Sequence, residues 1–320
     1  MDIKVVRYES SKKIVWDNFV TEAKNATFLF KRDFMDYHSD RFEDASLLIY
    51  KKNKLVALFP ANKFGEFEVI SHQGLTYGGI MFSKKDKLGS IKGYVKEILI
   101  YLNNLKIEVL TWKMFPSIYN ETNSDEIEYL MFLLDSKLYR RDVALVVSAN
   151  SVVKYSGNYR REAKKAEKAN AVIKKDDFNN FWKKILIPNL KIKHDVDPVH
   201  SLEEIELLRK KFPKNIIQYN VFLNNEIVGG TTLFVTPSCV HCQYISANDI
   251  GRKSGALNYL FIHLLDKIYP EIANFDFGIV NESDSLSINE GLLFWKENMG
   301  GRTIKHDFYR VDTKNHLKLD

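Results

Sequence analysis

The stretch FDFGIVNESDSLSINEGLLFWKENMGGR, from Phe275 to Arg302, decides how the chain folds. Its first residues are apolar and typical of a buried strand, its middle is a polar loop, and its end is a helix that stops at Gly300. The polar residues gather at the end of the strand and in the loop, and Lys296 follows Phe294 and Trp295 in the helix. Loops held by a rigid sheet commonly carry function, so we expect a ligand site at this end of the strand.

The same order of elements occurs twice in the chain. Three pairs of segments match in pattern, in the same order and at nearly constant spacing, although few of their residues are identical. This repeat predicts an α/β (α+β) protein of two tandem domains, residues 1–150 and 151–320, each a mixed, mostly antiparallel sheet flanked by helices. The matching segments are KNKLVALF (Lys52–Phe59) with NNEIVGGT (Asn224–Thr231), residues 90–112 with 256–278, and residues 124–147 with 288–311.

The size and charge of the chain agree with a soluble two-domain protein. Its 320 residues are enough for two domains, and its formal charge of +6 favours anionic ligands such as nucleotides, CoA or RNA without requiring them. It has no apolar run of about 18 residues, and its N-terminus lacks the apolar core of a signal peptide. We therefore expect a cytoplasmic protein without a membrane span, as a monomer or a homodimer.

The two cysteines of the chain lie close together, as Cys239 and Cys242 with His241 between them. This spacing suggests zinc, but a structural zinc site needs four ligands and the sequence has no second pair. The surrounding residues are typical of a buried strand. We therefore expect no metal site.

A strongly basic helix is predicted for NYRREAKKAEKANAVIKK, residues 158–175. One interpretation is a solvated connector helix. The other is that its cations meet a phosphate-bearing ligand. Further along, Ser201 and Glu204 have the spacing of a capping box, which predicts a helix that begins after Ser201. The cations in question are Arg160, Arg161, Lys164 and Lys165.

The helix end LFWKENMGG resembles the signature near the C-terminus of the GNAT acyl-CoA N-acyltransferases, and FDFGIVNES resembles their fifth strand and the following loop. HCQYISAND and IGRKSGALNYLFIHLL are similar to their fourth strand, pyrophosphate loop and third helix. Two such domains in one chain most resemble the FemABX-like branch. That branch contains aminoacyl-tRNA-dependent peptidoglycan transferases and acyl-CoA-dependent relatives that modify amino sugars.

The sequence departs from the family pattern at two places. The GNAT pyrophosphate loop is usually Gln/Arg-x-x-Gly-x-Gly/Ala, and here Arg252 and Gly255 match but Leu257 takes the last position. This weakens the match to conventional CoA binding. Lys296 stands where the family commonly has a tyrosine acid, as in the FemABX branch. The first half has no such loop, so the resemblance implies that the first domain shapes the acceptor site.

Acyl transfer to an amine requires a polarised carbonyl, a neutral amine and a stabilised leaving group. A strand that leads to a helix N-terminus supplies backbone N–H groups, and glycines let these groups approach an anion closely. We therefore expect the donor, acetyl-CoA as co-substrate, to be held by the segment from the strand to the helix. The expected donor-binding residues are Gln243, Tyr244, Ile245, Ser246, Arg252, Lys253, Ser254 and Gly255.

Lys296 is expected to neutralise the developing oxyanion or a donor phosphate, the alternative being an ordinary surface lysine. Asp276, His72 and His200 are candidate bases, because a carboxylate or an imidazole can take the proton of the amine. Asp276 has the alternative of an ion pair or a turn cap, His200 that of a surface position, and water chains can replace a single base. The residues expected to bind the acceptor are Tyr77, Asn281, Glu282 and Asn289.

The leading hypothesis is an N-acetyltransferase that acts, by direct attack on the thioester, on an amino sugar. The amino sugar would be nucleotide-linked or part of a surface glycan such as lipopolysaccharide. The alternative is a FemABX-type peptidoglycan aminoacyltransferase, for which tRNA would be the nucleic-acid partner. A third hypothesis is a non-catalytic binding module that has kept the fold. The acceptor rests on the family resemblance alone.

Overall fold

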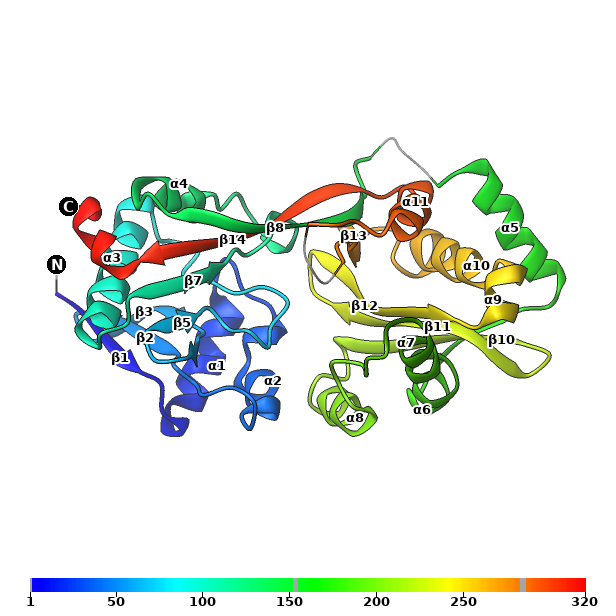
Figure 1. Ribbon diagram of the computed structural model, residues 1–320, viewed down its shortest axis with the longest axis horizontal. Coiled ribbons are helices and arrows are strands. Elements are labelled where there is room, and N and C mark those ends of the chain that lie inside the picture. The colour runs from blue at the N-terminus through cyan, green and yellow to red at the C-terminus, as the bar shows by residue number, and fades with distance from the viewer. Residues whose placement is uncertain (1, 152–154, 283–285) are drawn as a thin grey trace. The chain divides into compact units, whose positions relative to one another are not determined.

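The computed structural model describes residues 2–151, 155–282 and 286–320 (Figure 1). The chain divides into two compact units, of which unit 1 contains Met1–Asp142 and Lys305–Asp320 and unit 2 contains Val143–Ile304. The first boundary therefore lies at Asp142 and not at residue 150, and the last residues of the chain belong to unit 1.

Unit 1 has two groups of paired strands. The sheet β1-β2-β3-β6 is antiparallel throughout, and in the group β4-β5-β7-β14 only β5 and β7 are parallel. The bounds are β1 (Ile3–Arg7), α1 (Lys13–Glu22), α2 (Arg32–Met35), β2 (Leu47–Lys51), β3 (Lys54–Phe59), β4 (Asn62–Phe64), β5 (Glu68–Ile70), β6 (Met81–Phe82), α3 (Leu88–Asn104), β7 (Val109–Lys113), α4 (Glu126–Leu133) and the 3-10 helix η7 (Thr313–Leu319).

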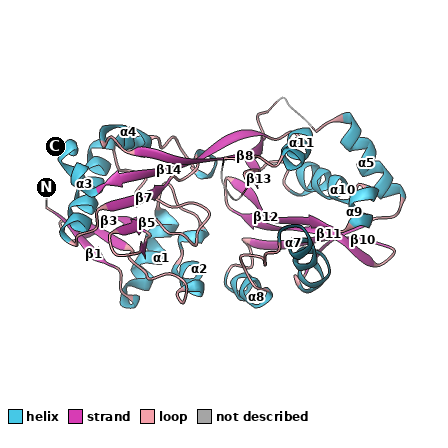
Figure 2. Cartoon of the chain, in the orientation of Figure 1, coloured by secondary structure: helices cyan, strands magenta, loops and turns pink. Residues whose placement is uncertain are grey.

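Unit 2 has one sheet with the strand order β8-β13-β12-β11-β10-β9, in which only β12 and β13 are parallel. Figures 1 and 2 show α5, α10 and α11 on one side of this sheet and α6, α7 and α8 on the other. The bounds are α5 (Gly157–Lys168), β9 (Val172–Asp176), α6 (Asn179–Phe181), the π-helix η5 (Trp182–Leu186), α7 (Ile187–His194), α8 (Leu202–Lys211), β10 (Ile216–Leu223), β11 (Glu226–Val235), β12 (Cys239–Ala247), α9 (Asp249–Ser254), α10 (Ala256–His263), the π-helix η6 (Leu264–Ile268), β13 (Asn274–Ile279) and α11 (Glu290–Asn298).

Each unit has its own apolar core beneath an amphipathic helix. In unit 1, α3 buries Ile91, Ile98 and Leu102 against the strands, and in unit 2, α10 buries Leu260 and Phe261. These helices are the ones that the three-to-four spacing of apolar residues predicts. The predicted mixed, mostly antiparallel sheet with flanking helices is confirmed. Of the helices in the described part of the chain, none has the length and apolarity that crossing a membrane requires.

The strands β8 (Lys137–Ser148) and β14 (Arg302–Asp312) each begin in one unit and end in the other. The end of β8 pairs antiparallel with β13, and the end of β14 pairs antiparallel with β7. The strand that follows α4 thus completes unit 2, and the strand that follows α11 completes unit 1. The repeat predicts both strands, but alternation of apolar residues does not encode which neighbour a strand chooses. Because the last strand of each repeat pairs within the other unit, the bounds of the two units differ from those of the two sequence repeats.

Candidate active site

The parallel strands β12 and β13 pair only at their beginnings. Residues 239–241 pair with residues 274–276, and this pairing ends at His241 and Asp276. Beyond this point β12 continues to Ala247 along β11, while β13 continues to Ile279 along β8. Among the described residues, the edge of β12 over residues 242–247 therefore has no strand partner on the β13 side. Such an edge can hydrogen-bond an extended ligand in the way a strand would.

A bulge in β12 lies at the start of this free edge. Thr232 of β11 pairs with Tyr244, and Leu233 pairs with Cys242, so Gln243 is the extra residue. Within the described parts of the chain, Gln243 Oε1 is buried and has no hydrogen-bond partner. A bulge redirects a side chain, and a buried acceptor without a donor is uncommon in folded proteins. Gln243 thus offers an acceptor to a ligand donor.

Asp276 and His241 form a hydrogen-bonded pair where the two strands separate. Asp276 is fully buried; its Oδ2 lies 2.7 Å from His241 Nδ1, and its Oδ1 accepts the N–H of Gly278 at 2.7 Å. The two residues are partners in the parallel ladder, so their side chains lie on the same face of the sheet. The His241 side chain keeps 12% of its surface exposed. A carboxylate at Nδ1 holds the ring proton there and leaves Nε2 as the acceptor.

Lys296 of α11 is buried at the end of β13. Its Nζ donates hydrogen bonds to the carbonyl oxygens of Gly278 at 2.9 Å and Ile279 at 2.8 Å. These carbonyls face the amine because Gly278 has a φ of +77° and the register of β13 against β8 shifts between Asp276 and Ile279. Burial lowers the pKa of Lys296 to about 8, although the charge of Asp276 acts in the opposite direction. The amine is therefore mostly charged at pH 7 and easily discharged above it, as acid–base groups in active sites often are.

Cys242 lies near Asp276 and Lys296, and its side chain is a protonated thiol. Burial raises its pKa well above the usual range, and the charge of Asp276 adds to the shift. A thiol that stays protonated is a poor nucleophile. The described residues contain no group of three or more His, Cys, Asp or Glu side chains that could hold a metal ion.

The segment expected to hold a pyrophosphate forms a short helix, α9, whose polar groups bind within the protein. Arg252 donates to the carbonyl oxygen of Ala247 and to the carboxylate of Asp249, and Asn248 Oδ1 accepts the N–H of Gly251 at 2.9 Å. Ser254 Oγ donates to the carbonyl oxygen of Gly251. The segment therefore differs from the open loop that the resemblance implies.

Gly255 and Lys253 complete this segment. Gly255 has a φ of +76°, and a Cβ at this position would lie 2.5 Å from the carbonyl oxygen of Glu162 in α5. Glycine is thus required at position 255 because another part of the backbone passes close to it. A sequence pattern alone does not tell whether such a glycine makes room for backbone or for a ligand. Lys253 is exposed.

Tyr244, Ser246 and Ile245 of β12 have protein partners. The Tyr244 hydroxyl accepts the backbone N–H of His200 at 3.1 Å and lies 2.7 Å from His200 Nδ1. Burial raises the pKa of Tyr244 to about 12, so this hydroxyl stays protonated near neutral pH. Ser246 Oγ accepts from Asn189, and Ile245 packs against the core. The structure thus gives the candidate base His200 a tyrosine partner and brings Asp276 together with Lys296.

His72 and Tyr77 belong to unit 1. His72 is buried with a φ of +69°, and burial, followed by the nearby His38, lowers its pKa well below the usual value. Its imidazole is therefore neutral near pH 7. Tyr77 is buried among aromatic rings, and its hydroxyl lies 2.9 Å from Thr27 Oγ1. Gly78 lies against backbone, because a Cβ there would be 1.8 Å from the carbonyl oxygen of Ser71.

The three loop residues expected to bind an acceptor differ in their surroundings. Asn281 Oδ1 accepts the N–H of Val143 at 2.7 Å, and Asn289 is the N-cap of α11, accepting the N–H of Leu292 at 2.9 Å. Glu282 is exposed. The side-chain amides of Asn281 and Asn289 therefore hold the two ends of the loop, and of these three residues Glu282 is the one whose side chain faces solvent.

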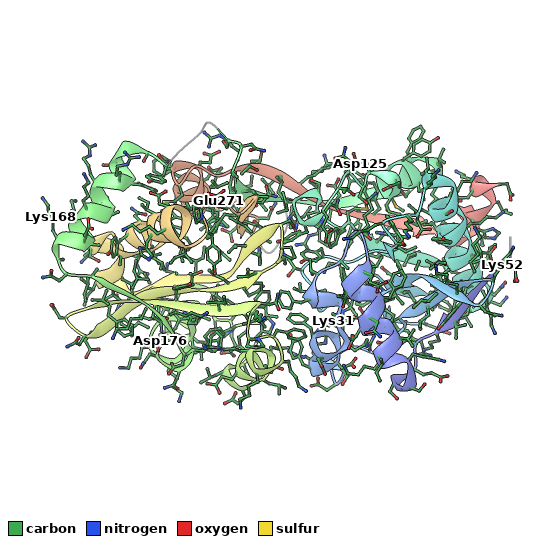
Figure 3. All side chains as sticks on the ribbon, turned by 180° about the vertical axis from the view of Figure 1, so that it is seen from behind. Lys31, Lys52, Asp125, Lys168, Asp176 and Glu271 are labelled. Atoms are coloured by element: carbon green, nitrogen blue, oxygen red, sulfur yellow. The ribbon has the colours of Figure 1, made fainter. Side chains whose placement is uncertain are left out.

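The basic helix is α5, which begins after its N-cap Ser156 and ends at Lys168, so residues 172–175, predicted as its last turn, form part of β9 instead. Its buried residues are Ala163 and Ala166, so its cations lie on the exposed side. Figure 3 shows Lys168 at the outer end of this helix. The capping box of Ser201 and Glu204 at the start of α8 is confirmed.

His241 is the functional candidate that the sequence pattern misses, because its position between two cysteines draws attention to metal binding. The useful signal is alternation: His241 is polar between the apolar Val240 and Cys242, as Asp276 is between Phe275 and Phe277. Two adjacent strands that each carry one such polar residue can bring the two side chains together.

Neither a protein-family model nor a curated protein matches the sequence. Solved structures do match over nearly the whole chain. The crystal structure of FemX has a TM-score of 0.67 at 9% identity and 99% coverage of both chains. The C-terminal domain of a putative lysylphosphatidylglycerol synthetase from Agrobacterium fabrum has a TM-score of 0.62 at 8% identity, with 97% of this chain and 95% of that chain covered. A tandem GNAT protein from the clavulanic acid biosynthesis pathway has a TM-score of 0.53 at 9% identity, with 97% and 98% covered.

These likenesses establish the fold, a tandem GNAT-like arrangement of the FemABX-like type. Identities near one residue in ten do not carry an activity from one protein to another. The chemistry of this chain has to be argued from its own residues.

Proposed function

We propose that the protein is an N-acyltransferase, which transfers an acyl group from an activated donor to a primary amine. The observation that supports this most is the separation of β12 from β13 directly after His241 and Asp276, with Lys296 buried at the same place. A free strand edge beside a charged amine and an imidazole–carboxylate pair is what a direct acyl transfer requires.

In the proposed reaction the acyl arm of the donor lies along the free edge of β12. The amine nitrogen attacks the carbonyl carbon, the new C–N bond forms, and the bond from carbon to the leaving sulfur or oxygen breaks. Negative charge develops on the carbonyl oxygen during the attack. Lys296 would stabilise this charge, because a buried ammonium group interacts more strongly with an anion than one in water does.

For the donor and acceptor we propose acetyl-CoA and an amino sugar, nucleotide-linked or part of a surface glycan. Both follow from the resemblance of the sequence to acyl-CoA-dependent members of the FemABX-like branch. The formal charge of +6 is compatible with an acceptor and a donor that both carry phosphates.

One observation favours a second candidate donor, an aminoacyl-tRNA. The guanidinium of Arg252, the hydroxyl of Ser254 and the N–H of Gly251 all hydrogen-bond other protein groups. These donors of α9 are therefore not free to bind the pyrophosphate of CoA. The exposed cations of α5 would then contact the phosphates of the tRNA. FemX, which this chain resembles in fold, suggests this donor through the FemABX branch.

The two donors are distinguished by supplying each to the purified protein. One reaction contains radiolabelled acetyl-CoA with a panel of UDP-linked amino sugars, and the other contains charged tRNA with a peptidoglycan precursor. Amide formation in the first supports acetyl-CoA. Amide formation in the second, with tRNA binding that weakens steeply between about 50 and 200 mM salt, supports the tRNA donor. Absence of transfer in both, together with absence of calorimetric binding of either donor, would reject the acyltransferase.

Replacing Lys296 by Met tests the role of the amine. We expect kcat to fall by about 10²- to 10³-fold, the usual cost of removing one group that stabilises the developing oxyanion. Lys210→Met on the exposed side of α8 is the matched control and should keep the wild-type rate. Equal rates for the Lys296 variant and wild type would exclude this role and favour a binding module. Thermal unfolding of both variants shows whether any loss is due to misfolding.

A further inference from the structure

We propose that His241 is the general base of unit 2 and that Asp276 positions it. This inference rests on the proposed acyl transfer and assigns the group that takes the proton of the attacking amine. The assignment moves the role of base from Asp276, one of the three candidate bases in the sequence, to its neighbour on β12.

Asp276 is poorly placed to accept a proton from a substrate. It has no exposed surface, Oδ1 is held by the N–H of Gly278, and Oδ2 is held by His241. His241 is the member of the pair that retains exposed surface. Because Nδ1 is bound to the carboxylate, the lone pair of Nε2 is the available acceptor, and Nε2 hydrogen-bonds none of the described residues.

The position of His241 is also the point where a donor would be attacked. It is the last residue of β12 that pairs with β13, so its imidazole lies at the inner end of the free edge. Gly278 lies beside the ring, since a Cβ at residue 278 would be in ordinary van der Waals contact with His241 Cε1, at 3.5 Å. The carbonyl oxygen of the same glycine accepts from Lys296. One glycine thus separates the proposed base from the proposed oxyanion-stabilising group.

Among the described residues, one titratable group contacts the imidazole, and two more interact electrostatically with that group. Asp276 of β13 contacts it directly, Cys242 is its neighbour on β12, and Lys296 of α11 interacts electrostatically with both Asp276 and Cys242. The thiol stays neutral because burial raises its pKa.

The proposed step conserves atoms and charge. As the amine nitrogen bonds to the donor carbonyl carbon, Nε2 of His241 accepts the proton that the nitrogen must lose. The bond from carbon to the leaving sulfur or oxygen breaks with its electron pair, and the imidazolium then returns the proton to that leaving atom. The products are an amide and a thiol or alcohol, and the imidazole is neutral again.

The test measures the pH dependence of kcat/KM for wild type, His241→Ala and Asp276→Asn with whichever donor supports transfer. For wild type, kcat/KM should rise with pH, as expected of a reaction that needs a neutral general base. His241→Ala should lower kcat/KM by about 10²- to 10⁴-fold and abolish this rise, and added imidazole should restore part of the rate. His263→Ala, on α10, is the control and should match wild type. A His241→Ala enzyme with the wild-type rate and pH profile would overturn the assignment.

Asp276→Asn separates positioning from packing. Asn Oδ1 can still accept the N–H of Gly278, so its NH₂ group faces His241 Nδ1 and turns that nitrogen into an acceptor. The proton then moves to Nε2, which can no longer act as a base. We expect the ¹⁵N spectrum of the imidazole to show a protonated Nδ1 in wild type and a protonated Nε2 in the variant, with a large loss of rate and little change in melting temperature.

This spectrum needs no substrate, so the two proposals can fail separately. Protonated Nδ1 in wild type with no transfer from either donor would reject the proposed function and leave the pair as described. Transfer by wild type with Nε2 protonated and Nδ1 free would reject His241 as the base. If Asp276→Asn does not fold, the spectrum of wild type and the rescue of His241→Ala by imidazole still decide the assignment.

Discussion

At the scale of single residues, two of the buried lysines have a pKa close to neutrality. Lys296 in unit 2 donates to Gly278 and Ile279, and Lys113, the last residue of β7 in unit 1, donates to the carbonyl oxygens of His72 and Leu75. Burial lowers the pKa of Lys113 to about 7 and that of Lys296 to about 8. Each unit therefore contains one amine that is close to its titration point near neutral pH.

The low pKa of Lys113 predicts how stability depends on pH. A lysine in the unfolded chain titrates near about 10.4, so between pH 7 and pH 10 the unfolded state binds one more proton than the folded state. The free energy of unfolding should therefore rise with pH, by about 2 kcal/mol between pH 7.5 and pH 9 from this group. Chemical denaturation of Lys113→Met should show this rise reduced relative to wild type. If the free energy of unfolding rose with pH equally in wild type and Lys113→Met, the lowered pKa of Lys113 would be contradicted.

At the scale of elements, the contact between α9 and β11 depends on Gly251. A Cβ at this position would lie 2.1 Å from the carbonyl oxygen of Val228, which is backbone and cannot rotate away. Helix α9 therefore lies directly on the strand next to β12. This packing fixes the segment that follows the free edge.

Gly251→Ala should destabilise the protein by about 2–4 kcal/mol, because the added methyl group forces helix and strand apart. The control is Gly89→Ala in α3, where a Cβ would meet nothing within 4 Å. That change should be neutral or stabilise by up to about 1 kcal/mol, since alanine is the better helix former. Urea unfolding measures both. Equal effects would show that the close contact at Gly251 does not exist.

The sequence predicts individual elements better than their contacts. The helices α3, α8 and α10 follow from apolar spacing and from the Ser201 cap, because these signals are local. The bulge at Gln243 and the helix α9 depend on neighbouring strands, which a linear pattern does not contain. In the candidate site, Asp276 and Lys296 are both predicted and lie close together, whereas His241 is missed because its position between two cysteines suggests metal binding.

At the scale of the whole molecule, the two repeats exchange their last strands. Unit 1 is completed by β14 and η7, whose residues Val311 and Leu319 are buried in its core. Unit 2 is completed by the end of β8. Neither half of the sequence, residues 1–150 or 151–320, contains all the strands of one unit.

Deleting residues 305–320 should therefore prevent unit 1 from folding, although these residues follow unit 2 in the sequence. The deletion leaves β7 without its antiparallel neighbour and removes two buried apolar side chains. We expect loss of the near-ultraviolet circular dichroism and protease protection of unit 1. Removal of Asp320 alone, an exposed terminal residue, is the control and should leave both signals intact. Native protection of unit 1 in the longer deletion would show that β14 is dispensable.

The path of β14 also constrains how the protein is made. While the chain is being synthesised, residues 1–142 leave the ribosome before β14, so β7 cannot pair with β14 until unit 2 has also been made. The edge of β7 therefore stays unpaired while unit 2 is translated, and exposed strand edges promote aggregation. We expect rapid elongation through unit 2, or a chaperone that covers this edge, to reduce aggregation during synthesis.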